Sequence, residues 1–404
     1  MTGVVLEERR PEMRGPLRAW ALRHRHAEPE SDRVPPIGEV EVTAIEPLRL
    51  GEAELWGVSA TIDDRPAHAV VGLCHPDAPL QALRSGDDPV LGFLTGGPGD
   101  VVLVDALAEL HLAILTVETI VGVQPGLRHA AVVADGEDGV EVSFDERWSL
   151  TAFPWPYEGS HPGVALLTAL DEAGFNHLPA PVAIWRRGGR DLGIVQEVIV
   201  GSAPGDAVAL TSLRDLYASG LSPEQAGGDF APEAEALGTM AARMHLALAG
   251  AFGWELGEID LAGDELAAPR APGSLVAPIL RTHGDFRLRR TARSDQGWVL
   301  QDTMPGGCDP RTGTPILRTP LADVGDMVRS FRDVAQEAAQ VRDPTGRLGA
   351  TALGEAWERR NAAALLRGYR DTPGIEELLP ADRSVIDQLV ARLSRERGPG
   401  RPAL

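Results

Sequence analysis

The chain of 404 residues contains no lysine, so its 38 Lys and Arg residues are all arginines. Every basic side chain is therefore arginine or histidine, and chemistry that depends on a side-chain amine is excluded. A GC-rich coding bias that replaces lysine by arginine is the simplest cause of the overall absence. Asparagine is also scarce and occurs only at Asn176 and Asn361.

Cysteine and long apolar runs are scarce as well. The two cysteines, Cys74 and Cys308, lie far apart and lack the paired spacing of metal ligands, which suits a reducing compartment. The most apolar run, residues 101–122, is interrupted by three acidic side chains. The first residues carry charges where a signal peptide has its apolar core. We therefore expect a cytoplasmic protein with no membrane partner.

Net positive charge is absent too, because the formal net charge is −21. Binding to nucleic acid needs a basic face that releases counterions, so this balance argues against a polyanionic partner. With 43% hydrophobic residues, the chain can bury a sizeable core in about two or three domains.

The first half of the chain has strand patterns separated by Gly, Pro and Asp. Strands are predicted at residues 38–50, 55–63 and 67–76, followed by a helix over residues 101–121. Further strand patterns cover residues 129–135, 139–153, 180–187 and 192–200, with a helix predicted at residues 161–174.

The second half is mainly helical after a predicted linker at residues 201–206. Apolar side chains recur at three and four positions over residues 232–253 and again over residues 319–339, which predicts two amphipathic helices. Thr319 is the expected N-cap of the second helix, with Pro320 in its first position. His245 lies on the apolar face of the first helix, which favours a packing role. The tail, residues 396–404, is expected to fray.

One short segment carries the chemistry. A His-Gly-Asp turn at His283–Asp285 precedes a strand that ends at Asp302. Kinase-like enzymes present a catalytic base and then a metal ligand in this order. Five residues after Asp285, where such enzymes keep an amide for magnesium, the chain has Arg290.

Residues 283–335 resemble the actinobacterial maltokinases, a group within the aminoglycoside-phosphotransferase branch of the kinase-like fold. The segments that carry the resemblance are "HGD", "RSDQGWVLQD" and "PLADVGDMVRSF", and "LGTMAARMHLALAGAFG" is similar to the helix before them. In the small lobe, "SLTAF", "HPGVALLTALDEAGF" and "IVQEVIV" are similar to the lysine strand, the glutamate helix and the hinge. The resemblance implies an α+β, bilobal protein-kinase-like fold. Its expected parts are an N-terminal cap at residues 1–115, a small lobe at residues 116–201 and a large lobe at residues 202–404.

The resemblance also assigns site positions. It places the catalytic base at Asp285, a magnesium ligand at Asp302, and the hinge that borders the nucleotide at Gln196 and Glu197. At three other functional positions the chain has residues that cannot do the family's chemistry. Thr151 is found where the family has its phosphate-anchoring lysine, Ala165 where it has the glutamate partner of that lysine, and Arg290 where it has the second metal ligand.

Further departures surround these positions. Arg287 replaces a histidine, and Thr303 and Met304 replace the Phe-Glu that follows the metal ligand. The polar phosphate loop is replaced by "RHAAVV" at residues 128–133, and no aromatic residue follows Tyr369, where maltokinases have sugar-facing tyrosines.

Structural roles compete with these functional ones. Asp285 and its histidine either brace the loop or keep a chemical role, and Asp302 could simply end a strand. The arginines at 287, 289, 290 and 293 either neutralise phosphates without a metal or form a solvated loop paired with acids. Trp148, Trp155 and Tyr157 fit a core better than a sugar platform.

Loss of these elements predicts a pseudokinase, a kinase fold kept as a binding or regulatory module, with no cofactor expected. The alternative is an active sugar or amino-sugar kinase that uses Asp285, magnesium on Asp302, ATP, and Arg128 or Arg147 in place of the lysine. For the pseudokinase we expect a protein partner or self-association through a face with Trp185, Arg186 and Arg187, and a sugar is a further candidate ligand.

Overall fold

The computed structural model describes residues 6–24, 37–51, 53–95, 100–136, 139–260, 274–301, 307–309, 312–343, 349–380 and 382–395. The chain divides into two compact units. The first comprises the described residues up to His161 together with Ala180–Val200. The second comprises Pro162–Pro179 and the described residues from Gly201 onward. The domain boundaries expected from the sequence, at residues 115 and 201, stay predictions.

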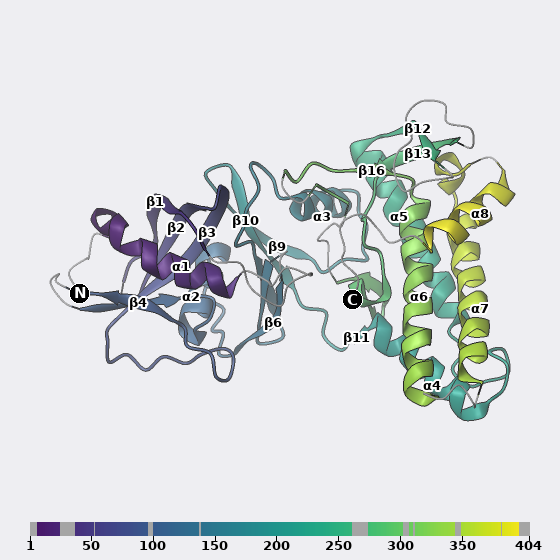
Figure 1. Cartoon of the computed structure of the whole chain (residues 1–404), viewed down its shortest axis with the longest axis horizontal. Coiled ribbons are helices and arrows are strands. Elements are labelled where there is room, and N and C mark those ends of the chain that lie inside the picture. The colour runs from purple at the N-terminus through teal and green to yellow at the C-terminus, as the bar shows by residue number, and fades with distance from the viewer. Residues whose placement is uncertain are drawn as a thin grey trace. The chain divides into compact units, whose positions relative to one another are not determined.

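The first unit begins with an antiparallel sheet in the order β1-β2-β3-β5-β4 (Figure 1). Its strands are β1 (Val40–Arg49), β2 (Glu54–Ile62), β3 (Arg65–Cys74), β4 (Val90–Leu94) and β5 (Val101–Asp105). The 3-10 helix η1 (Leu6–Met13) and the helix α1 (Arg14–Arg23) pack on this sheet through a core that includes Leu17, Trp20 and Val58. The three strands predicted at residues 38–50, 55–63 and 67–76 are confirmed.

The helix predicted over residues 101–121 is wrong in its first part. Residues Val101–Asp105 form β5, which pairs with β3 and β4, and the helix α2 runs only over Leu110–Val121. A run rich in β-branched valines favours a buried strand, and periodicity alone does not separate such a run from a buried helix. The side chain of Glu109 then caps α2 by accepting the N–H of Leu112 at 2.9 Å, which fixes where the helix starts.

A second antiparallel sheet completes the first unit, in the order β6-β7-β8-β10-β9. Its strands are β6 (Ala130–Gly136), β7 (Gly139–Phe144), β8 (Trp148–Ala152), β9 (Pro181–Arg187) and β10 (Arg190–Glu197). Helix α2 packs against both sheets: Leu112 shares a core with the first sheet, and Ala113 and Val117 share one with the second. These strands agree with the patterns predicted between residues 129 and 200.

The second unit is mainly helical (Figure 1). Its helices are α3 (Pro162–Glu172), α4 (Gly205–Ser219), α5 (Ala231–Phe252), α6 (Leu321–Arg342), α7 (Ala350–Arg370) and α8 (Arg383–Leu393), with 3-10 turns η2 (Leu288–Arg290) and η3 (Ile375–Leu378). The unit also contains two small three-stranded sheets. One consists of β11 (Ala203–Pro204), β14 (Thr291–Ser294) and β15 (Gly297–Leu300). The other consists of β12 (Trp254–Asp260), β13 (Ser274–Arg281) and β16 (Leu317–Arg318).

Two local predictions in this unit need correction. The predicted linker at residues 201–206 contains β11 and the start of α4. Thr319 is not the N-cap of α6, because Pro320 holds that position and the Thr319 hydroxyl has no hydrogen-bond partner among the described residues. The two amphipathic helices predicted around residues 232–253 and 319–339 are confirmed as α5 and α6. The tail, residues 396–404, lies outside the described residues.

Helices α5 and α7 cross at unusually short range because glycine faces backbone on both sides. A Cβ at Gly238 would lie 2.0 Å from the carbonyl oxygen of Leu365, and one at Gly368 would lie 2.0 Å from that of Glu235. The crossing therefore requires a residue without a side chain on each helix. It places His245 of α5 beside Tyr369 of α7, with the ring centroids 5.7 Å apart.

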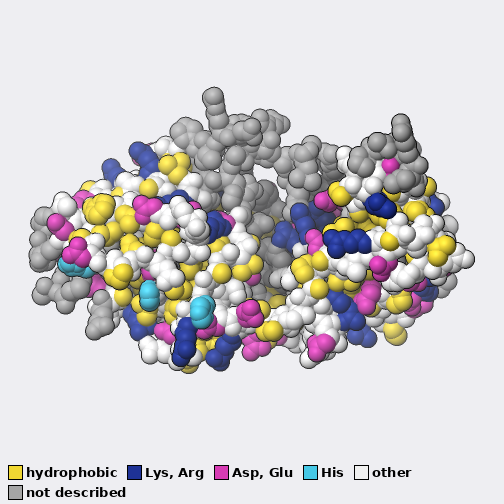
Figure 2. Space-filling model, turned by 90° about the horizontal axis from the view of Figure 1, so that it is seen from below, with side chains coloured by type: hydrophobic (Ala, Val, Ile, Leu, Met, Phe, Trp, Pro, Cys, Tyr) yellow, Lys and Arg dark blue, Asp and Glu magenta, His cyan; other side chains and the backbone are white. Residues whose placement is uncertain are grey.

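The surface carries charges of both signs. On the face in Figure 2, arginine and acidic side chains are interspersed across the described residues, without a large field of one sign. Among the described helices, none is long and apolar enough to cross a membrane.

Candidate functional site

The His-Gly-Asp turn follows β13 and is almost completely buried. His283 is fully buried and Asp285 is 4% exposed. Gly284 adopts a positive φ of 83°, a conformation that favours glycine. The backbone N–H groups of His283 and Gly284 both donate to the carboxylate of Asp323 at 2.9 Å. One acidic side chain from α6 therefore fixes the shape of the turn.

Asp323 is held from the other side by His245. Nε2 of His245 lies 3.1 Å from Oδ2 of Asp323, and Nδ1 lies 2.9 Å from the hydroxyl oxygen of Tyr369. Burial acts to raise the pKa of Asp323, but the hydrogen bond with His245 and the charges of His245, His283 and Arg318 together outweigh it and lower the pKa to about 2. Burial raises the pKa of Tyr369 well above its usual value and lowers the pKa of His283. The packing role predicted for His245 is confirmed, with Asp323 as its partner.

Sequence reasoning missed Asp323. Its signal lay in "PLADVGDM", where two acidic residues sit among apolar ones at the start of a helix. All residues from Leu321 to Val328 are buried, so an acid in this turn needs an internal partner. An acidic residue at a buried position of a helix therefore indicates that a nearby loop donates hydrogen bonds to it.

Asp285 is surrounded by arginines from the turn that follows it. Oδ1 accepts the Nε–H of Arg287, and Oδ2 accepts the Nε–H of Arg290 at 3.0 Å. A third guanidinium, that of Arg289, lies 3.8 Å from Oδ2. The short 3-10 turn η2 brings these side chains onto one carboxylate. We call Arg287, Arg289 and Arg290 the arginine cluster. Arg293, which the sequence grouped with them, pairs with Glu233 at 2.8 Å instead.

The described part of the site does not fit a magnesium ion. Magnesium needs oxygen ligands with free lone pairs, and a guanidinium has only donors and a positive charge. Arg290 stands in the position that the resemblance gives to the second metal ligand, and its Nε–H is directed at Asp285. Asp302, Thr303 and Met304 lie outside the described residues.

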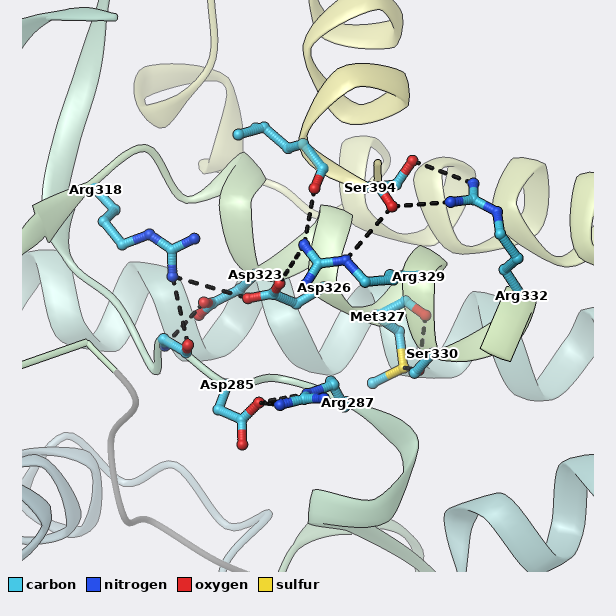
Figure 3. Close-up of polar contacts among 12 residues, drawn as sticks. Asp285, Arg287, Arg318, Asp323, Asp326, Met327, Arg329, Ser330, Arg332 and Ser394 are labelled. Carbon is cyan, nitrogen blue, oxygen red and sulfur yellow. Dashed lines mark hydrogen bonds and ion pairs between the residues drawn. The ribbon is translucent and has the colours of Figure 1, made fainter. Parts of the chain in front are cut away.

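A second charged group connects the turn to α8. In Figure 3, Arg318 reaches toward Asp326 and toward the backbone of the turn. Its Nη1 lies 3.8 Å from Asp326 Oδ2 and donates to the Gly284 carbonyl at 3.4 Å. Asp326 also pairs with Arg329 at 2.9 Å, and Arg329 donates to the carbonyl of Leu393 at the same distance. Burial raises the pKa of Asp326 to about 7. The end of α8 is thus tied through charged groups to the turn.

The positions predicted in the first unit lie on its second sheet. Thr151 is on β8, opposite Glu141 of β7 and Ile194 of β10, and its side chain is half-buried. Gln196 and Glu197 end β10, opposite Ser149 and Trp148 of β8. Ala165 is half-buried on α3, which belongs to the second unit.

The backbone of the predicted phosphate loop already has a partner. The N–H groups of Arg128 and His129 donate to the carboxylate of Asp145, each at 2.9 Å. A phosphate loop uses such N–H groups to hold its anion, and here the side chain of Asp145, from the turn between β7 and β8, takes that role. The Arg128 side chain is exposed, and the guanidinium of Arg147 lies 5.0 Å from the ring centroid of Trp148.

A groove of about 500 Å³ lies on the second unit between the start of α5 and one face of α7. Its arginines are already paired: Arg360 contacts Asp229 and Arg367 contacts Glu235, each at 2.6 Å. The predicted site positions do not line it.

Comparisons with known proteins identify the architecture. No protein-family model matches the chain. A glucosamine kinase in complex with glucosamine, ADP and inorganic phosphate superposes with a TM-score of 0.57 at 18% identity, covering 88% of each chain. Two crystal forms of glucosamine kinase give TM-scores of 0.58 and 0.56 at 19% identity, covering 93% and 94% of this chain. At this identity the likeness shows the fold: the chain has the α+β kinase-like fold of the aminoglycoside-phosphotransferase type.

Proposed function

We propose that this chain is a maltokinase-like pseudokinase, a kinase-like fold that serves as a binding module and transfers no phosphoryl group at a useful rate. The observation that carries the proposal is the state of Asp285. Both of its carboxylate oxygens accept from guanidinium groups, and the side chain is only 6% exposed. A general base must instead present an oxygen to the hydroxyl of its substrate.

Other parts of the site support the same conclusion. The chain has no lysine to anchor nucleotide phosphates, and Arg290 brings a positive charge where a second metal ligand is expected. The N–H groups of Arg128 and His129 are already bonded to Asp145. Removal of one such electrostatic contributor costs on the order of a hundredfold to a thousandfold in rate, so their joint loss leaves little activity.

The test is an assay of ADP release with magnesium and ATP, using glucosamine, maltose and simple hexoses as acceptors. The proposal expects a rate indistinguishable from that of the Asp285→Asn variant. Turnover near about one per second that Asp285→Asn abolishes would establish an active kinase and overturn the proposal.

The second candidate function is an ATP-dependent amino-sugar kinase with a remodelled site. It is favoured by the match to glucosamine kinase structures over most of both chains. In this candidate Asp285 is the base, Asp302 holds a single magnesium ion, and Arg128 or Arg147 replaces the lysine. Thermal shift with ATP separates the two candidates, because the kinase requires a rise in melting temperature that depends on magnesium.

A binding module acts through its surface, and we propose a protein partner or a second copy of the chain as its ligand, with a sugar as a further candidate. Of the face expected from the sequence, Trp185 is buried against His68 and belongs to the core. Arg186 pairs with the fully buried Asp191 at 2.6 Å, so its charge has a structural role. Arg187 is 39% exposed and pairs with Glu46 at 3.2 Å, which leaves it as the residue to test.

A further inference from the structure

The arginine cluster gathers three positively charged side chains in one short turn. Three guanidiniums contact the single carboxylate of Asp285. Burial lowers the pKa of Arg289, and the positive charge of Arg287 lowers it further. An additional anion is the natural complement of this arrangement.

Arg289 is the member of the cluster that can receive this anion. Its side chain is 51% exposed, and its distance of 3.8 Å from Asp285 is too long for a hydrogen bond. The negative charge of Asp206 also acts on it. By contrast Arg293, Arg360 and Arg367 each have a carboxylate within 2.8 Å. Within the described residues, Arg289 lacks such a close partner.

The backbone that carries the cluster is held firmly in place. The N–H of Leu288 donates to the hydroxyl of Ser330 at 3.2 Å, and the Thr291 hydroxyl donates to the carbonyl of Leu288 at 2.8 Å. The first residue of α4, Gly205, packs so closely that a Cβ there would lie 2.5 Å from both the Leu288 carbonyl oxygen and the Thr291 hydroxyl. A turn fixed in this way presents its side chains in a defined geometry, as a binding site requires.

We propose that the arginine cluster binds the phosphate group of a phosphate monoester directly, without a divalent cation. Guanidinium groups recognise phosphate oxygens through paired, charge-assisted hydrogen bonds and need no metal to do so. Arg289 supplies the exposed contact, and Arg287, which is 18% exposed, lies beside it on the same carboxylate. The proposal rests on the proposed function, because a site engaged in catalysis would need Asp285 free of these arginines.

The experiment is calorimetric titration of the full chain in EDTA with inorganic phosphate, glucose 6-phosphate and ADP as separate probes. We expect binding of at least one probe, with Arg289→Gln weakening it by about tenfold or more because a charge-assisted contact is lost. Arg293→Gln, four residues away and paired with Glu233, is the matched control and should leave the affinity within about twofold. Comparison of the probes shows whether the ester group or the phosphate alone is recognised.

Asp285→Asn gives a second readout of opposite sign. It removes the carboxylate that competes for the arginines, so phosphate affinity should rise, in contrast to the fall expected for Arg289→Gln. Absence of binding by all probes, binding only with magnesium, or equal effects of Arg289→Gln and Arg293→Gln would each overturn the inference. The proposed function fails separately, through turnover that depends on Asp285. Circular dichroism of each variant checks that it is folded.

Discussion

Arg290 donates its Nε–H to Oδ2 of Asp285 at 3.0 Å. The sequence resemblance gives Arg290 the position of a metal ligand and Asp285 that of the catalytic base, so the two predicted positions are hydrogen-bonded to each other. In the proposed pseudokinase, Arg290 therefore affects both positions: it brings a positive charge to the first and occupies a carboxylate oxygen of the second. The pair also links the turn after β13 to the 3-10 turn η2.

Asp285→Asn should destabilise the protein by about 2–4 kcal/mol, because a buried carboxylate is removed and its arginine partners remain. Urea denaturation followed by circular dichroism measures the loss. Asp295→Asn, an exposed aspartate in the turn between β14 and β15, is the control, with an expected change within about 0.5 kcal/mol. Equal stability of the Asp285 variant and wild type would contradict a bracing role for this carboxylate.

Asp323→Ala should cost about 3–5 kcal/mol. The substitution leaves the N–H groups of His283 and Gly284 and the ring of His245 without their acceptor inside the protein. The control on the same helix is Asp333→Ala, an exposed aspartate whose removal should change stability by less than about 0.5 kcal/mol. Hydrogen exchange at His283 and Gly284 should also accelerate in the Asp323 variant, and unchanged protection there would refute the assigned contacts.

Glycine substitutions on α5 should have opposite signs. Gly238→Ala forces a methyl group onto the Leu365 carbonyl and should destabilise the protein by about 3 kcal/mol or cause α5 and α7 to separate. Gly250 lies on the same helix with open space around its Cα, so Gly250→Ala should stabilise the protein by about 0.5–1 kcal/mol. Thermal melts of both variants test the crossing of α5 and α7. An unchanged melting temperature for Gly238→Ala would show that the two helices lie farther apart than described.

Stability should fall at alkaline pH because of His24. Burial acts to lower the pKa of His24, but Asp105 at 3.3 Å and Asp135 at 3.9 Å outweigh it and raise the pKa to about 9. Since this value lies above the ordinary 6.5, the contribution of the charged histidine is fully present below about pH 6.5 and is lost as the pH rises through about 9. The contribution is on the order of 3 kcal/mol.

His24→Gln should therefore remove most of the difference in unfolding free energy between about pH 6 and about pH 10. His75→Gln is the matched control, because His75 is exposed and should leave the difference intact. A pH dependence that is the same in the His24 variant and in wild type would rule out this histidine as its source.

Arg187→Glu should weaken self-association or the capture of a protein partner while the melting temperature stays nearly constant. Arg186→Glu should instead lower the melting temperature, because it places a negative charge against the buried Asp191. Analytical ultracentrifugation and calorimetry of the two variants separate the roles. A monomeric wild-type protein that captures no partner would remove the basis of the interaction proposal.

The sequence by itself determined the order of strands and helices in most of the chain, because alternation and three-to-four spacing report local exposure to solvent. It failed at residues 101–121, where a buried strand and a buried helix share the same apolar composition, and at Thr319, where the start of the helix depends on its exact first residue. The sequence alone also shows that the chain has no lysine, which excludes a lysine as the anchor for nucleotide phosphates.

Only the tertiary structure decided what the polar residues contact. Arg287, Arg289 and Arg293 look equivalent in the sequence, yet two of them lie against Asp285 and the third pairs with Glu233 from α5. Asp323 looks like one acid among many until the fold places it under the turn at His283, forty residues earlier in the chain. Such pairings join residues that are distant in sequence, so no local pattern encodes them; they arise because buried charges and N–H groups must find partners once the helices pack.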